Sequence, residues 1–205
     1  SSSYSSIGGG GANAISASNY STIAGGTNNE IKSLNLALSG WGIIGGGECN
    51  FITNTCYATI GGGCANLATG VKSTIGGGTL NTASAGCGFI GGGCLNNICS
   101  GETFATIGGG RQNRVDGDYS AIAGGYLNCA DINCTFIGGG YSNNITSDGN
   151  LSVLGGGRDN TLGDSCSFIG GGDTNIIVNS ANGQGFMTIG GGQFNCTSCG
   201  GAAVL

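Results

Sequence analysis

Apolar residues recur along the chain at a fixed place before a run of glycines. The motif is Ile-Gly-Gly-Gly-x-x-Asn, with Ala or Leu as single replacements, and it occurs twelve times. Its apolar first residues, which define position 0 of each repeat, are Ile7, Ile23, Ile44, Ile60, Ile75, Ile90, Ile107, Ile122, Ile137, Leu154, Ile169 and Ile189. Neighbouring anchors are most often 15 residues apart, which is too short for two helices and fits two short strands with two turns. The pattern predicts a parallel β-solenoid of about twelve coils, in a single domain over residues 1–205.

Each repeat also carries an asparagine at position +6, and a second, usually apolar position follows two residues later. The asparagines are Asn13, Asn29, Asn50, Asn66, Asn81, Asn96, Asn113, Asn128, Asn143, Asn160, Asn175 and Asn195. Equivalent residues of stacked strands lie about 4.8 Å apart and form ladders. A glycine ladder permits positive φ and close backbone approach at a corner, and asparagines can share hydrogen bonds between coils. We therefore expect an all-β coil of strand, glycine corner, asparagine, second strand and variable turn.

Positions −3 and −1 lie on one face of the first strand, because side chains alternate along a strand. In most repeats one of the two is aromatic and the other is small, and in three repeats the order is reversed. Such a size rule matters only where packing is tight. The size rule predicts a packed face and a parallel homotrimer in which the three copies of this face surround the axis. The residues of the face are Tyr4, Tyr20, Trp41, Tyr57, Phe89, Phe104, Tyr119, Phe136, Phe168 and Phe186. The alternative is that these aromatics lie flat on a solvent-exposed sheet.

One stretch, Ser73-Thr-Ile-Gly-Gly-Gly-Thr-Leu-Asn-Thr-Ala83, carries a resemblance to two groups of repeat proteins. It is similar to the head repeats of YadA-type trimeric autotransporter adhesins, and closer to the Ile-Gly-Gly-Gly-x-x-Asn arrays of phage and giant-virus fibre-like proteins. The resemblance covers nearly the whole chain and implies a trimeric, left-handed parallel β-roll that serves as a spacer or attachment surface. The triple glycine, the longer coils and the many cysteines depart from the adhesin pattern.

Charge and hydropathy disfavour two classes of partner. Ten acidic residues outnumber five basic ones, which are scattered along the chain at Lys32, Lys72, Arg111, Arg114 and Arg158. Without a basic stripe, binding to nucleic-acid phosphates is not expected. No apolar run approaches the roughly 20 residues of a membrane-spanning helix, so membrane insertion is not expected either.

Eleven cysteines leave an odd thiol in any intrachain pairing. Cys49 and Cys64 occupy nearly equivalent corners of adjacent coils, and Cys129 and Cys134 share one connection, so these two pairs are the candidate disulfides. Disulfides suit an extracellular or virion surface. The cysteines of the three reversed repeats can instead serve as small buried hydrophobes; they are Cys87, Cys134 and Cys166.

Metal, cofactor and catalytic chemistry are not expected. The chain has no histidine, and only Cys196 and Cys199 have the spacing of zinc ligands, without a second pair. No Ser or Cys has a visible base partner. Charged residues such as Asp116, Asp118 and Asp159 fall in corners or connections, where a charge is normally solvated. The sequence therefore predicts no cofactor and no enzymatic activity.

The function expected from these patterns is a structural rod, such as a fibre shaft, an extracellular filament subunit or an adhesin stalk at a cell or virion surface. Stacked backbone hydrogen bonds would make it stiff. The insertions 32–42 and 178–185 are candidate lateral contacts. The apolar chain ends predict either that the chain continues into other domains or that copies join end to end into a filament. Two alternatives are a glycan- or host-surface-binding adhesin module, whose aromatics stack on sugars, and an ice-binding protein that uses the threonines at position −1.

Overall fold

The computed structural model describes residues 2–33, 40–101, 103–146, 148–178, 185–198 and 203–204. These residues form an all-β parallel solenoid without helices, with about 11 turns and a period of about 16 residues. The predicted all-β parallel solenoid is confirmed. The turn number and period differ slightly from the prediction because twelve anchors bound eleven turns and insertions lengthen some coils. Most of the two insertions, 34–39 and 179–184, lies outside the described residues.

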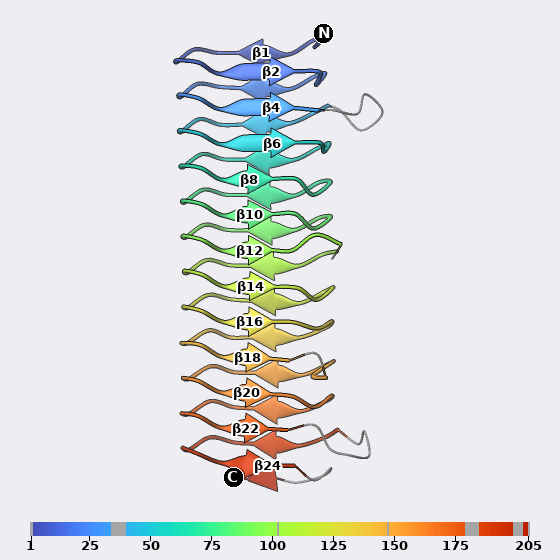
Figure 1. Ribbon diagram of the computed structural model, residues 1–205, viewed down its shortest axis with the longest axis vertical. Helices are drawn as coiled ribbons and strands as arrows, with labels where there is room; N and C mark the ends of the chain where they lie inside the picture. Colours follow the sequence, from blue (N-terminus) through green and yellow to red (C-terminus); the bar gives the residue numbers. More distant parts are fainter. Residues whose placement is uncertain are drawn as a thin grey trace. The chain divides into compact units, whose positions relative to one another are not determined.

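The chain divides into two compact units, Ser1–Phe104 and Ala105–Leu205. In the first unit each complete coil contributes one strand to each of two parallel sheets (Figure 1). One sheet has the order β1 (Ser6–Ile7), β3 (Thr22–Ile23), β5 (Ile43–Ile44), β7 (Thr59–Ile60), β9 (Thr74–Ile75) and β11 (Phe89–Ile90). The other has the order β2 (Ala14–Ser16), β4 (Glu30–Lys32), β6 (Phe51–Thr53), β8 (Leu67–Ala68), β10 (Thr82–Ala83) and β12 (Asn97–Ile98).

The second unit repeats this arrangement. One sheet has the order β13 (Thr106–Ile107), β15 (Ala121–Ile122), β17 (Phe136–Ile137), β19 (Val153–Leu154), β21 (Phe168–Ile169), β23 (Thr188–Ile189) and β25 (Ala203–Val204). The other has the order β14 (Arg114–Val115), β16 (Cys129–Ala130), β18 (Asn144–Ile145), β20 (Thr161–Leu162), β22 (Ile176–Ile177) and β24 (Cys196–Thr197). The register pairs each anchor with the next, so equivalent positions stack into columns.

A third side of each coil is held by a single backbone bridge at position +4. The bridged residues are Gly11, Thr27, Glu48, Cys64, Thr79 and Cys94 in the first unit, and Arg111, Tyr126, Tyr141, Arg158, Asp173 and Gln193 in the second. The sequence predicted only two strands per coil. This third side could not be predicted, because a bridge of one residue has no alternation of polar and apolar positions.

The interior of each unit is filled by inward-facing columns. The anchors are fully buried except for Ile7 in the first coil, which is exposed. Beyond the first coil, position +8 is buried as well, as at Ile31 and Ile52, and so are the mostly small residues at position −2, such as Ser73. Each buried isoleucine stabilises the coil by about 1.5–3 kcal/mol relative to an exposed one. The narrow core therefore consists of the large anchor from one sheet, a residue at position +8 from the other that is large in most coils and alanine in three, and a mostly small residue from position −2.

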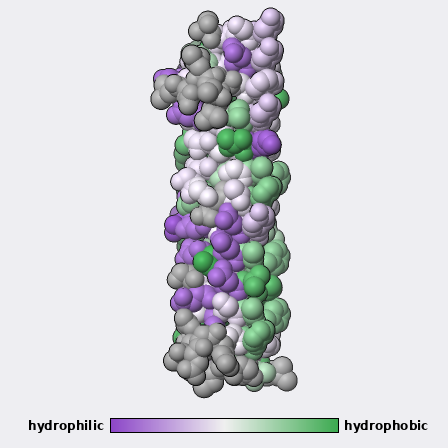
Figure 2. Space-filling view, turned by 90° about the vertical axis from the view of Figure 1, so that its right-hand side faces the viewer, coloured by the Kyte–Doolittle hydropathy of each residue, from purple (hydrophilic) through white to green (hydrophobic). Residues whose placement is uncertain are grey.

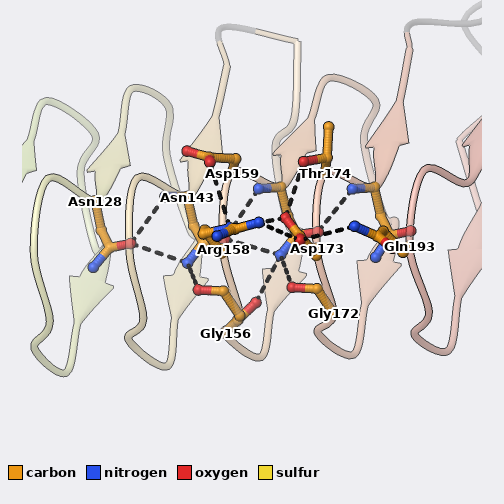
Figure 3. Close-up of polar contacts among 12 residues, drawn as sticks. Asn128, Asn143, Gly156, Arg158, Asp159, Gly172, Asp173, Thr174 and Gln193 are labelled. Atoms are coloured by element: carbon orange, nitrogen blue, oxygen red, sulfur yellow. Dashed lines mark hydrogen bonds and ion pairs between the residues drawn. The ribbon is translucent and has the colours of Figure 1, made fainter.

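The asparagines at position +6 form a hydrogen-bonded ladder inside each unit. Asn29 shows the pattern. Its Nδ2 donates to Oδ1 of Asn13 and to the carbonyl oxygens of Gly25 and Gly47, at 2.9–3.2 Å. Its Oδ1 accepts from the backbone N and from Nδ2 of Asn50, at 3.0 and 3.1 Å. Figure 3 shows part of the same ladder in the second unit. Because the buried amide has partners for both its donors and its acceptor, the ladder holds neighbouring coils in register without leaving unpaired polar groups.

The three glycines of the motif meet different surroundings. At position +3 φ is positive in all twelve repeats, and a Cβ on Gly78 would lie 2.1 Å from the carbonyl oxygen of Gly93. At position +1 the next coil is also close, but φ is not positive and two repeats carry alanine, at Ala24 and Ala123. At position +2 a Cβ on Gly77 would meet nothing within 4 Å. Positive φ and close approach, both expected of the glycine ladder, therefore coincide only at position +3.

Candidate interaction face

Positions −3 and −1 both face outward, on the sheet made of the odd-numbered strands. Position −1 is the first residue of each of these strands, and position −3 lies in the turn before it. We call these two columns the aromatic face. Its exposed large residues are Tyr4, Tyr20, Trp41, Ile43, Tyr57, Phe89 and Phe104 in the first unit, and Tyr119, Phe136, Leu151, Val153, Phe168 and Phe186 in the second. All ten aromatics predicted for a packing face thus lie on it, and in the single chain they are exposed to solvent.

Polar and apolar residues are not mixed evenly over the surface. Figure 2 shows hydrophobic residues along the lower part of the right-hand edge of the view, with hydrophilic ones beside them, whereas the upper part of that edge is more polar. On the aromatic face, Lys72 is the single charge among the described residues at positions −3 and −1. Contiguous apolar surface on a soluble protein typically marks an interaction site. The aromatic face is therefore the candidate functional surface of each unit.

The backbone at position −3 is left-handed in every repeat, with φ from 52° to 75°. Position +5 has the same conformation in every repeat, with φ from 53° to 59°. This conformation costs a residue other than glycine about 1–2 kcal/mol. Position +5 holds Ala, Asn, Leu, Ser and other types, with Phe194 as its one aromatic, whereas position −3 is mostly aromatic. The conformation therefore does not select aromatic residues, and their enrichment at position −3 needs a separate cause.

Four aromatics of the first unit form a continuous ring stack. Tyr4, Tyr20, Trp41 and Tyr57 have successive centroid distances of 5.1, 5.2 and 4.8 Å, with rings inclined by 6° to 10°. This spacing is close to the separation of neighbouring strands, because each ring belongs to one coil. Offset-stacked rings add about 0.5–1.5 kcal/mol per pair beyond area burial. The flat faces of the two middle rings are thus turned toward neighbouring rings, and their edges toward solvent.

The three reversed repeats place a cysteine at position −3 beside a phenylalanine at position −1. The expectation that these cysteines are buried small hydrophobes is wrong within the single chain, where Cys134 and Cys166 are exposed and Cys87 is only half-buried. They are exposed because the whole column points away from the interior. The tight packing inferred from the size rule is not made within one chain.

The two predicted disulfides are not formed. Cys49, Cys64, Cys129 and Cys134 are all free. Cys49 lies at position +5 and Cys64 at position +4 of the next coil, so the two belong to different columns. Cys129 lies in β16, where its Sγ donates to Oδ1 of Asp131 at 2.8 Å, whereas Cys134 lies on the aromatic face. Burial and then the Asp131 contact raise the pKa of the Cys129 thiol, which keeps it protonated.

The charged residues considered for catalysis are engaged by neighbours. Arg158 Nε donates to Oδ1 of Asp173 at 3.0 Å, and Nε2 of Gln193 donates to Oδ2 of the same carboxylate at 3.1 Å (Figure 3). The hydrogen bond from Arg158 lowers the pKa of Asp173. Asp159 lies 3.8 Å from Arg158, and Asp116 is paired with Arg114. These exposed pairs contribute little to stability.

Within the described part of the chain, no group of three or more His, Cys, Asp or Glu side chains is placed to hold a metal ion. Cys199, half of the candidate zinc spacing, lies outside that part. A helix long and apolar enough to cross a membrane is likewise absent from the described residues. No known protein-family profile matches the chain, and no curated protein is detectably similar to it in sequence.

Proposed function

We propose that this chain is a structural β-solenoid whose copies associate side by side through the aromatic face into a parallel trimer, as the subunit of a rod or fibre. The observation that carries the proposal is the concentration of exposed aromatic side chains at position −3, which position +5 lacks although it has the same left-handed backbone and exposed residues. Burial against another copy would remove these aromatic side chains from water.

Charge supports a second copy of this chain as the occupant of the aromatic face. Each copy carries a net charge of −5, so copies repel one another over most of their surface. The aromatic face carries Lys72 as its one charge among described residues, so like copies meet there at the smallest electrostatic cost. Removing its aromatic side chains from water supplies the driving force.

The geometry of the ring stack favours packing between chains over sugar binding. An aromatic platform for a ligand needs a free flat face. Tyr20 and Trp41 have ring neighbours on both faces, at 4.8–5.2 Å. For the ice-binding alternative, Ile43 and Phe89 interrupt the threonines at position −1. Ring edges that project outward can instead insert between side chains of a neighbouring copy.

The test replaces two tyrosines of the aromatic face by asparagine, which tolerates a left-handed backbone. We expect Tyr20→Asn/Tyr57→Asn to weaken association at least about tenfold, because buried aromatics dominate interface energies. The matched control is Leu80→Asn/Leu95→Asn at position +5. It changes residues of similar exposure (48% and 40%, against 49% and 48% for the tyrosines) and of the same φ, off the aromatic face. Sedimentation across a dilution series gives both dissociation constants. Equal weakening by the two variants would refute the aromatic face as the contact.

A further inference from the structure

We propose that the large and small residues of the aromatic face form a recognition code, in which position −3 of one copy packs against position −1 of the next copy at the same coil. This inference rests on the proposed self-association and adds its register, its direction and its selectivity for identical chains. A contact between two different columns is heterologous, and heterologous contacts close into rings when the rotation allows. A parallel trimer is such a ring.

The first argument is that sizes match when the copies are in register. In an ordinary coil of the second unit, Tyr119 of one copy would meet Ala121 of the next. In a reversed coil, Cys134 would meet Phe136. Nine of the twelve coils join one aromatic and one small residue in this way, whichever column carries the aromatic. The exceptions are Trp41 with Ile43, Lys72 with Thr74, and Leu151 with Val153. Close packing requires such a constant volume along the seam.

The second argument is that a shifted register breaks the match. A shift of one coil in one direction opposes Tyr119 to Phe136, and in the other direction it opposes Phe186 to Phe168. A shift of two coils opposes Tyr57 to Phe89 within the first unit. Two large residues at one contact overpack it. In register, no coil of either unit opposes two aromatic residues, although Trp41 still meets Ile43.

The third argument concerns contacts between identical columns. If position −3 met position −3 across a twofold axis, Trp41 would meet Trp41 while Cys87 of the same unit met Cys87. The width of such a seam would then vary from coil to coil. Straight stacks of coils with a fixed spacing cannot follow that variation, so large contacts would hold the small ones apart and leave cavities. Pairing of unlike columns avoids this problem.

The test is subunit exchange between the wild-type chain and a variant with the sizes reversed in two coils. The variant is Cys134→Phe/Phe136→Cys combined with Cys166→Phe/Phe168→Cys. Position −3 already accepts phenylalanine at Phe186. Alone, the variant keeps the size sum of every coil, so we expect it to form the same particle as the wild-type chain. The variant is then mixed with isotope-labelled wild type under reducing conditions, and the reference is a mixture of labelled and unlabelled wild type. The variant mixture should give at least about tenfold fewer mixed particles than the reference mixture. The reason is that every mixed ring opposes two phenylalanines at one seam and two cysteines at another.

Native mass spectrometry separates the outcomes. Free mixing of variant and wild type overturns the code but leaves self-association intact, whereas a monomeric wild-type chain refutes the self-association itself. A particle of two copies also overturns the ring and favours an antiparallel pair centred on the coil of Leu151. In that pair Cys134 of one copy would meet Phe168 of the other, so the sizes match within the second unit. A variant that folds, by circular dichroism, but does not assemble alone contradicts the code as well. If the variant does not fold, the single-coil swap Cys134→Phe/Phe136→Cys takes its place, with the same expected exclusion from wild-type particles.

Discussion

Replacing Asn29 by Asp is expected to lower the free energy of unfolding by about 3–5 kcal/mol, the cost of a buried charge without a partner. The Asn29 side chain is fully buried, and its Nδ2 faces three acceptors: Oδ1 of Asn13 and the carbonyl oxygens of Gly25 and Gly47. An aspartate oxygen at that place has no proton to donate and would face these three oxygens at hydrogen-bonding distance. Both neighbouring coils would lose contacts at once.

The adjacent residue gives the matched control. Asn28→Asp adds the same charge one position away, at an exposed site whose φ of 56° aspartate tolerates. We expect its effect to stay within about 0.5 kcal/mol, as for most surface substitutions. Chemical denaturation followed by circular dichroism measures both. A loss of similar size in the two variants would show that the amide ladder does not hold the coils together.

Replacing Gly78 by Ala is expected to cost at least about 2–4 kcal/mol. Its φ of 87° disfavours any residue with a Cβ, and that Cβ would lie 2.1 Å from the carbonyl oxygen of Gly93 in the next coil. The nearby Nδ2 of Asn81, at 2.8 Å from the same Cβ, leaves no room on that side. Because the carbonyl of Gly93 belongs to the next coil and Asn81 blocks the other side, the two coils must separate locally to admit the methyl group.

The neighbouring Gly77 serves as the control for this change. A Cβ there would meet nothing within 4 Å, and its φ lies outside the left-handed region. Gly77→Ala should therefore change the unfolding free energy by less than about 1 kcal/mol. Thermal melting of the two variants side by side checks the pair. If both variants melt together well below the wild-type chain, the distinction between positions +2 and +3 is wrong.

The sequence predicted the fold well because every coil repeats the same environment. An isoleucine at position 0, an asparagine at position +6 and an apolar residue at position +8 recur with fixed spacing, so a pattern that is weak in one coil is strong over twelve. The inward placement of these columns follows from the alternation of side chains along each strand.

The left-handed corners could not be predicted from residue type. Tyr57, Lys72 and Leu151 at position −3 give no signal for positive φ, and at position +5 only residues such as Asn28 and Asp159 hint at it. The disulfide predictions were wrong because spacing alone could not separate the columns of Cys49 and Cys64, which differ by one residue around the coil. The size rule did single out positions −3 and −1, and the structure places both columns on one exposed face of each unit.

The central claim is that the aromatic face joins copies of this chain. The most direct measurement is the mass of the wild-type particle in solution, by sedimentation velocity under reducing conditions over a wide range of concentrations. The account predicts a particle of three times the 19.8 kDa chain mass that dissociates only on strong dilution. A single species of 19.8 kDa at every concentration would contradict it.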